Sequence, residues 1–205
     1  MTSFSADLPA TPFSDGWVTT ALRRPSANFD VRPDGCTPDL LVIHAISLPS
    51  GQFSATYIDD LFLNQLDLTA HPSFAQLEGV RVSAHFLIRR DGTLVQYVST
   101  DQRAWHAGVS EFLGRARCND FSIGVELEGS DAVPFELPQY ATLVELTATL
   151  LQHYPLQHVA GHEDIAPGRK TDPGPFFDWQ LYQHSLNLHL PLVPANSAIR
   201  FRATR

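Results

Sequence analysis

Lysine is almost absent from this chain of 205 residues, which contains 13 arginines but a single lysine, Lys170. Acidic residues outnumber basic ones by 22 to 14, so the formal net charge is -8. Nucleic-acid binding depends on cations that neutralise phosphates, so this charge balance disfavours a nucleic-acid partner, and we expect none. It leaves room for a small anionic substrate, which a few local arginines can bind.

Long apolar runs and targeting signals are also missing. No run of about 18 apolar residues occurs, so the sequence predicts no membrane span. Residues 1–7 have neither the basic segment nor the apolar core of a secretory signal, and we therefore expect a cytoplasmic protein. The two cysteines, Cys36 and Cys118, fit neither a disulfide scaffold nor a thiolate zinc cluster. We expect both to be reduced and structural.

The length predicts one domain that is large enough for a true core. Residues 1–15 are polar and contain two prolines, which is typical of a loose leader. Residues 190–205 contain two prolines and three arginines, which is typical of a tail. The main domain is therefore expected at 16–189, without internal repeats.

Hydrophobic periodicity predicts strands at 39–45, 84–90, 94–98, 121–129 and 157–162. It predicts helices at 56–65, 137–154 and 177–188, the first with Thr56 as its N-cap. Residues 66–80 are expected to form a loop. The turn Asp91-Gly92-Thr93 predicts a hairpin between the second and third strands, so the sheet cannot be purely parallel. The expected fold is α/β, with a mixed central β-sheet flanked by helices.

Three side chains suggest a metal centre. His44 and His162 each end a predicted strand, at the sheet edge where ligands of α/β proteins gather, and Asp172 follows in a loop rich in glycine and proline. Two imidazoles and one carboxylate leave a fourth tetrahedral position for water, which is the pattern of catalytic zinc. His85 and His106 are alternative ligands, and spacing alone does not choose among them.

Lys170 stands two residues before Asp172 and eight after His162. A compact ammonium group can stabilise a developing oxyanion, and the alternative is that Lys170 is a solvated surface lysine.

On the strand predicted at 121–129, Glu126 and Glu128 share the polar face, so the pattern does not show which of the two is catalytic.

Five segments, taken in order, resemble the zinc-dependent N-acetylmuramoyl-L-alanine amidase type 2 family, whose fold is shared with peptidoglycan-recognition proteins. They are Leu41-Val42-Ile43-His44, Val82-Ser83-Ala84-His85-Phe86-Leu87-Ile88-Arg89-Arg90-Asp91-Gly92, Arg103-Ala104-Trp105-His106-Ala107-Gly108, Arg117-Cys118-Asn119-Asp120-Phe121-Ser122-Ile123-Gly124-Val125-Glu126-Leu127-Glu128-Gly129 and Gly161-His162-Glu163-Asp164-Ile165-Ala166-Pro167-Gly168-Arg169-Lys170-Thr171-Asp172-Pro173-Gly174. The resemblance runs from about Gly16 to Tyr182, and it implies that residues 16–189 form a zinc amidase domain.

The resemblance implies one zinc ion (Zn2+) per chain, bound by His44, His162 and Asp172. It implies catalytic roles for Glu126, as the group that moves protons, and for Lys170, as the partner of the oxyanion. Zinc polarises an amide carbonyl and acidifies water, and a nearby carboxylate can carry a proton to the leaving amine. Glu128 is then expected to be structural.

The family's substrate pocket implies a second group of residues. Arg81 and Arg117 are candidate clamps for carboxylates, which guanidinium groups bind in bidentate fashion. Trp105 and His106 are candidates for the cleft wall, with a packed aromatic residue as the alternative. One departure is Ala45, where members of the family usually carry asparagine, and this change bears on substrate specificity. His85 is expected to be buried and hydrogen-bonded.

The function implied is hydrolysis of the amide between the (1,6-anhydro-)N-acetylmuramoyl lactyl group and L-alanine of muropeptides, during cell-wall recycling. Two alternatives share the fold: a module that binds peptidoglycan without cutting it, and an amidase that remodels the intact wall. A third is a structural protein whose histidines belong to the core. The presence of all five metal and catalytic residues favours the enzyme. The oligomeric state stays open.

Overall fold

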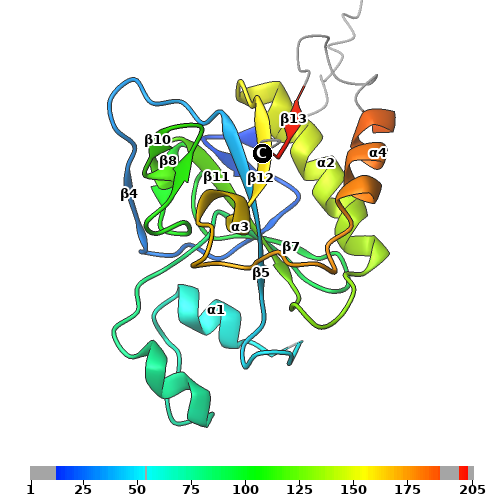
Figure 1. Ribbon diagram of the computed structural model, residues 1–205. Coiled ribbons are helices and arrows are strands. Elements are labelled where there is room, and N and C mark those ends of the chain that lie inside the picture. Colours follow the sequence, from blue (N-terminus) through cyan, green and yellow to red (C-terminus); the bar gives the residue numbers. More distant parts are fainter. Residues whose placement is uncertain (1–12, 54, 190–198, 203–205) are drawn as a thin grey trace, which may run out of the picture.

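A mixed sheet of seven strands runs through the protein, whose computed structural model describes residues 13–53, 55–189 and 199–202. Within these residues the strand order is β13-β12-β5-β11-β6-β7-β3 (Figure 1). In that order the strands span Arg200–Phe201, His158–Gly161, Leu40–Ile46, Ser122–Glu128, Phe86–Ile88, Leu94–Gln96 and Leu22–Arg23. The first five are mutually parallel, whereas β7 is antiparallel to β6. The predicted α/β fold with a mixed sheet is confirmed.

Short ribbons accompany this sheet in the described part of the chain. They pair β1 with β2, β4 with β8 and β9 with β10, all antiparallel. Their strands span Phe13–Ser14, Trp17–Val18, Phe29–Val31, Gln102–Ala104, Glu111–Phe112 and Arg115–Ala116. Strands of two or three residues are too short to show a hydrophobic period, and for this reason the sequence predicts none of them.

The three expected helices form with slightly different ends, as α1 (Tyr57–Phe62), α2 (Leu137–His153) and α4 (Trp179–His189). Two short 3-10 helices, η1 (Pro72–Leu77) and η2 (Cys118–Asp120), and one helical turn, α3 (His162–Ile165), are additional. Among the described residues, no helix has the length and apolar character that a membrane crossing requires.

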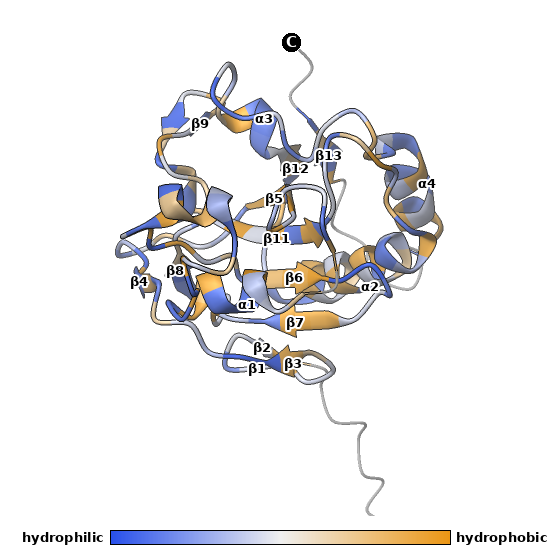
Figure 2. Ribbon diagram, turned by 90° about the horizontal axis from the view of Figure 1, so that it is seen from below, coloured by the Kyte–Doolittle hydropathy of each residue, from blue (hydrophilic) through white to orange (hydrophobic). Residues whose placement is uncertain are grey.

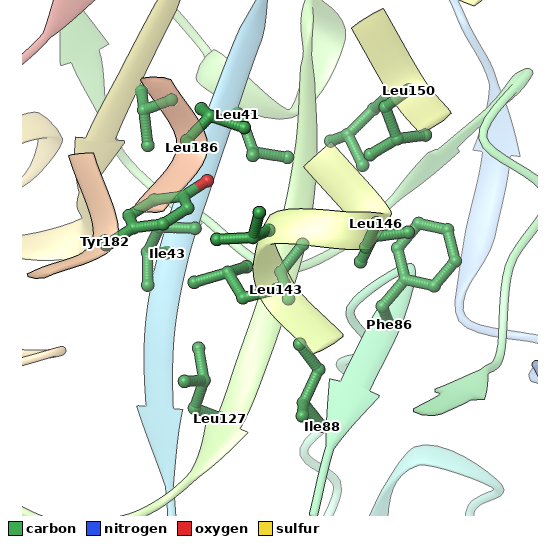
Figure 3. Packing of buried hydrophobic residues seen from close by; sticks show 14 of the residues in the cluster. Leu41, Ile43, Phe86, Ile88, Leu127, Leu143, Leu146, Leu150, Tyr182 and Leu186 are labelled. Atoms are coloured by element: carbon green, nitrogen blue, oxygen red, sulfur yellow. The ribbon is translucent and has the colours of Figure 1, made fainter. Parts of the chain in front are cut away.

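One face of the sheet packs against α2 and α4, which lie side by side (Figure 1). Figure 3 shows the contact: side chains of β5, β11 and β6 meet leucines of α2 and Tyr182 and Leu186 of α4. Leu143, Leu146 and Leu150 recur at helical spacing, so they fall on the side of α2 that faces the sheet. They are almost fully buried. Truncating one of them to alanine would cost about 2–5 kcal/mol of stability.

The opposite face of the sheet carries two smaller apolar clusters and, between them, polar side chains. One cluster lies under α1, where Ile58 and Phe62 pack on Leu87 and Tyr97. The other joins Leu40 and Val42 to the segment that precedes β11. Figure 2 shows that β6 and β7 are predominantly hydrophobic. Strand β6 buries apolar residues on both faces, because Phe86 and Ile88 belong to the core beneath α2 and Leu87 belongs to the cluster under α1. The polar residues between the two smaller clusters therefore interrupt an otherwise apolar face.

Four local expectations require correction. Residues 66–80 are not entirely loop, because η1 forms there and the side chain of His71 accepts the N–H of Ser73 at 3.2 Å. Thr56 precedes α1, but its hydroxyl donates to the side chain of Asp60 and does not cap the helix. His162 begins α3 instead of ending a strand. The first two corrections involve local side-chain hydrogen bonds that the hydrophobic pattern does not show, and at the start of α3 the side chain of Asp164 accepts the N–H of Gly161 at 2.8 Å.

The fourth correction concerns the chain ends. Within the expected tail, Arg200 pairs with His158, so β13 extends the sheet at its edge. Arg202 donates to Glu163 and Asp164 at 2.8 Å each, which ties this segment to α3. Of the expected leader, Phe13 and Ser14 form β1, and the expectation for residues 1–12 lies outside the described residues, as does that for 190–198 and 203–205.

Candidate active site

Three parallel strands bring polar residues into one row. Glu126 of β11 is the register partner of His44 on β5, and Gly161 of β12 is the partner of Ile43. His162 follows Gly161 directly, so it emerges beside His44. Side chains at one register position of adjacent parallel strands lie on the same face of the sheet. The row therefore comes from residues that are distant in sequence but fixed by strand pairing.

His44, His162 and Asp172 converge at the centre of this row. The Nδ1 atoms of the two histidines are 3.0 Å apart, and Asp172 Oδ2 lies 3.1 Å from His44 Nδ1 and 3.0 Å from His162 Nδ1. Both imidazoles are buried, and Asp172 is partly buried. The Asp172 carbonyl accepts the N–H of Glu163 at 2.8 Å, which holds the loop against α3. The structure thus brings together the three ligands that the sequence predicts.

The charge states of this group favour a cation. Burial lowers the pKa of His44 to about 4, so the ring is neutral at physiological pH. Burial by itself raises the pKa of Asp172, but hydrogen bonds with His162 and His44 outweigh it and hold that pKa well below its ordinary value. The carboxylate is consequently ionised. A neutral imidazole and a carboxylate are the protonation states that metal binding requires.

The donor set fits zinc. In a tetrahedral site with bonds of about 2.0–2.1 Å, ligand atoms lie about 3.3–3.4 Å apart. The three ligand atoms here are separated by 3.0–3.1 Å, which is close to that spacing. Among the described residues, these three side chains are the one group of at least three that could hold a metal ion. Two nitrogens and one oxygen are typical zinc ligands, and a set of three leaves a fourth position open.

Glu126 is buried next to this group without a hydrogen-bond partner for its Oε2 atom in the described part of the chain. Burial raises its pKa well above the ordinary value, the charge of Asp172 raises it further, and Lys170 opposes both. An unpaired buried carboxylate costs stability, and such groups are concentrated at functional sites. A buried carboxylate with a raised pKa is compatible with the predicted role of Glu126 as the group that moves protons.

Lys170 is exposed and lines the same cavity. Its backbone N–H donates to Ala166 at 3.0 Å, and its ammonium group makes no hydrogen bond or ion pair with any other residue that the structure describes. It therefore remains available to a ligand. Its charge is felt at both Glu126 and His44, because it lowers the pKa of each.

Glu128, the second glutamate on this strand face, has a structural environment. Its carboxylate lies 3.7 Å from Arg89 and accepts the backbone N–H of Arg90 at 3.3 Å. Arg89 also binds Asp59 of α1 at 2.5 Å. Glu128 therefore belongs to a network that joins β11 to the hairpin and to α1. Strand periodicity places both glutamates on one face, and only these contacts distinguish them.

A cavity of about 180 Å³ contains the site. His44, His162, Asp172, Glu126 and Lys170 line it together with eight other residues, among them Ala45, Trp105 and His106. A hollow of about 330 Å³ adjoins it and shares Ala45, Ile46, Lys170 and Asp172. The larger hollow of about 860 Å³ beside α2 contains none of these residues.

The structure separates the other candidates. Trp105 and His106 line the cavity, whereas Arg81 lines a distinct shallow hollow beside Leu61 and Leu77. Arg117 is exposed, has a left-handed backbone (φ 64°) and lies 3.3 Å from Asp120. Neither arginine lines the cavity itself. His85 is fully buried, and its Nδ1 accepts the N–H of Gly124 at 3.0 Å, so it serves the sheet and is not a ligand.

Comparison with known proteins decides the family. The family model for N-acetylmuramoyl-L-alanine amidase (Amidase_2) matches residues 34–175, which include every residue of the row described above. The chain belongs to this family. The predicted resemblance and the predicted enzyme class are thereby confirmed: this protein is an N-acetylmuramoyl-L-alanine amidase.

Individual relatives agree with the assignment of this amidase. It is 55% identical over 170 residues to the 1,6-anhydro-N-acetylmuramyl-L-alanine amidase AmpD of Escherichia coli K12, covering 82% of this chain and 93% of that protein. A crystal structure of an AmpD derivative superposes with a TM-score of 0.81 at 52% identity, covering 83% of this chain and 97% of that one.

A third relative was solved as a complex. It is the amidase AmiD from E. coli with the substrate anhydro-N-acetylmuramic acid-L-Ala-D-gamma-Glu-L-Lys, which has a TM-score of 0.53 and 32% identity. The match covers 75% of this chain and 60% of that protein.

Asn119 is a buried residue of the site that pattern reasoning does not single out. Its side-chain oxygen accepts the N–H groups of His106 and Ala107 at 3.2 and 2.8 Å. An asparagine before a strand is ordinarily a turn residue, and nothing in its sequence context signals contact with a segment 12 residues earlier. Only the folded geometry reveals it.

Proposed function

We propose that this protein is a zinc-dependent hydrolase that cuts the amide between the (1,6-anhydro-)N-acetylmuramoyl lactyl group and L-alanine in muropeptides, as part of cell-wall recycling. The observation that carries the proposal is the row of His44, Glu126 and His162, completed by Asp172 and Lys170 around one cavity. High identity to AmpD along most of the chain supports this substrate class. The alternative of a module that binds without cutting assigns no role to the unpaired carboxylate of Glu126.

His44, His162 and Asp172 would hold one zinc ion per chain. Bound there, zinc would supply a Lewis acid for the scissile carbonyl and lower the pKa of a water molecule. Burial raises the pKa of Glu126, which makes its carboxylate a stronger base than that of an exposed glutamate, and the charge of Lys170 opposes this rise. Its carboxylate accepts a proton from the attacking water.

The second half of the reaction returns that proton. The water oxygen bonds to the carbonyl carbon, the carbon–nitrogen bond breaks, and Glu126 delivers the proton to the departing amine of L-alanine. The ammonium of Lys170 faces the negative charge that develops on the carbonyl oxygen. Such a preorganised partner typically contributes about 100-fold or more in rate. Neither residue is required to hold the metal.

Trp105 and His106 form part of the wall against which the substrate would rest. Arg81 and Arg117 lie outside the cavity, so we assign them to the distal carboxylates of the peptide, which a guanidinium binds well. Ala45 borders both the cavity and the adjoining hollow. Its methyl group supplies no hydrogen bond where an asparagine would, and Ala45→Asn is expected to change KM more than kcat.

We also propose that the enzyme acts in the cytoplasm on soluble fragments and that it binds neither nucleic acid nor a membrane. The 55% identity to the 1,6-anhydro-N-acetylmuramyl-L-alanine amidase AmpD of Escherichia coli supports a muropeptide fragment as the substrate. The test is a product analysis with three substrates: an anhydro-muropeptide, the same peptide on a reducing-end sugar, and intact sacculi. The proposal requires soluble muropeptides to be cut far faster than sacculi. Comparable rates on sacculi would favour the wall-remodelling alternative, and binding without products would favour the non-catalytic module.

A further inference from the structure

In each histidine of the proposed metal centre, Nδ1 faces the centre and Nε2 has another partner. The hydrogen-bond partner of Nε2 determines which tautomer the ring adopts. His162 Nε2 lies 3.2 Å from the carbonyl oxygen of Ala107. A carbonyl oxygen only accepts hydrogen bonds, so Nε2 carries the hydrogen. In the tautomer with Nε2–H, the Nδ1 atom carries no hydrogen and presents its lone pair toward Asp172 and His44. The tautomer of His162 is therefore fixed by a backbone group.

The tautomer of His44 follows from a longer chain of hydrogen bonds. Ser122 Oγ donates to the carbonyl of Cys118 at 2.6 Å, so it accepts from His106 Nε2, which lies 3.2 Å away. His106 Nδ1 consequently has a free lone pair and accepts the hydrogen of His44 Nε2 at 2.9 Å. This leaves His44 Nδ1 unprotonated. Both Nδ1 atoms point into the centre as acceptors.

The fold reserves space for His106. A Cβ atom at Gly124, on the sheet face that also carries Glu126, would lie 2.5 Å from the ring of His106. No real side chain tolerates that approach, so only glycine fits beneath the ring. This accounts for the glycine in the middle of β11, which otherwise weakens a strand.

Asn119 fixes the backbone that carries both partners. Its side-chain oxygen accepts the N–H groups of His106 and Ala107, and Asn119 itself is buried. Arg169, from the loop of Asp172, donates to the Ala107 carbonyl at 2.8 Å and to that of Val109 at 2.6 Å. The backbone of residues 106 and 107 is thus fixed by Asn119 through its N–H groups and by Arg169 through the Ala107 carbonyl.

We infer that His106 and Asn119 are positioning residues of the metal centre, which fix the tautomers and ring orientations of His44 and His162. His106 acts through its ring, and Asn119 acts by fixing the Ala107 carbonyl. This inference rests on the proposed zinc site. Partners of metal-bound histidines typically affect metal affinity by about 10–100-fold. Without an acceptor at its Nε2, His44 can adopt the tautomer whose Nδ1–H blocks the metal.

The first test compares paired variants by zinc affinity, measured in competition with a chelator. His106→Asn keeps an oxygen where Nδ1 stood, whereas His106→Leu has the same shape as asparagine and no acceptor. Leucine should weaken zinc binding by about 10–100-fold and asparagine by much less. Asn119→Asp keeps the oxygen that accepts both N–H groups, and Asn119→Leu removes it, so the same contrast is expected. Equal affinities within each pair would overturn the inference.

The second test reads the tautomers directly. Long-range ¹H–¹⁵N NMR spectra of the zinc-loaded protein should show Nε2–H and a metal-bound Nδ1 for both His44 and His162, and Nε2–H for His106. Because spectra of the parent need no variant to fold, they remain decisive if His106→Leu is unstable. An Nδ1–H on either ligand would contradict the inference while leaving zinc binding intact. A parent protein that binds no zinc would instead overturn the metal site itself, and this inference with it.

Discussion

His44 and Glu126 are direct register partners on adjacent parallel strands, although neither side chain hydrogen-bonds to the other in the described residues. Strand pairing alone holds the proposed zinc ligand and the proposed base at neighbouring positions of one sheet face. His44 has three polar contacts, whereas Glu126 Oε2 has none. Both ring nitrogens of His44 have partners, whereas Glu126 lines the cavity with one carboxylate oxygen unpaired. This difference agrees with the different roles proposed for the two residues.

Zinc content should depend most strongly on the three predicted ligands. We expect one zinc per chain in the parent protein and a large loss in His44→Ala, His162→Ala and Asp172→Ala, because each supplies an atom of the 3.0–3.1 Å cluster. Metal analysis after exhaustive dialysis measures this. His85→Ala is the comparison, since that histidine faces Gly124 and not the centre. Zinc retained in all three ligand variants would refute the assignment.

The two glutamates of β11 should behave differently. Glu126→Gln should keep its zinc and fold, yet lose roughly two orders of magnitude in kcat, because an amide cannot carry the proton. Glu128→Gln is the matched control on the same strand and face. It weakens a contact with Arg89 and should therefore lower stability but keep most of the activity of folded protein. The reverse pattern would mean that the carboxylates have been interchanged.

Lys170→Ala should reduce kcat by about 100-fold or more while zinc content and folding stay unchanged. Its ammonium has no partner among the described residues, so its removal breaks no internal contact. Lys170→Arg should recover only part of the activity, because a planar guanidinium fills the space differently. Full activity of the alanine variant at saturating substrate would exclude a role in the chemical step.

Acid should destabilise the zinc-free protein partly through His85. Burial, and then the charge of Arg32, lower the pKa of His85 to about 3 in the folded state, against 6.5 for the ordinary residue. Between these values the unfolded chain binds more protons, so stability is fully present above about pH 6.5 and falls as the pH decreases toward 3. The slope from this residue reaches about 1.4 kcal/mol per pH unit.

Urea unfolding at several pH values between 7 and 4 measures that slope. His85→Asn keeps an oxygen near the position of Nδ1 but has no proton to gain, so its stability should decline less steeply than that of the parent. His184→Asn, a change at an exposed histidine of α4, serves as the control and should follow the parent. Parallel curves for all three proteins would show that His85 does not contribute.

Much of the fold follows from periodicity. Strand β5 and helix α2 have long, regular apolar patterns, and both were predictable to within about one residue. The turn at Gly92 was equally clear, since its φ of +87° suits glycine and Asp91 accepts the N–H of Thr93. The ribbons and η1 were not predictable, because they consist of too few residues to show a period.

The site was only partly predictable. The family motif indicates His44, His162 and Asp172, whereas spacing alone leaves His106 equally eligible as a ligand. The structure places His106 behind His44, in contact with the second ring nitrogen. The sequence pattern could not separate Glu126 from Glu128 either, since that distinction depends on the arginine that the hairpin brings to one of them. Both distinctions, between His106 and the ligands and between the two glutamates, depend on contacts between segments that are distant in sequence.

The most direct test of the central claim is hydrolysis of a soluble anhydro-muropeptide in H₂¹⁸O, followed by mass spectrometry. If water attacks the lactyl carbonyl, the zinc-loaded parent should release a peptide with a free L-alanine amine and a muramic acid that carries one ¹⁸O in its new carboxylate. The zinc-stripped protein should release neither product, and zinc should restore both. Cleavage at any other bond, or undiminished cleavage by the stripped protein, would contradict the account.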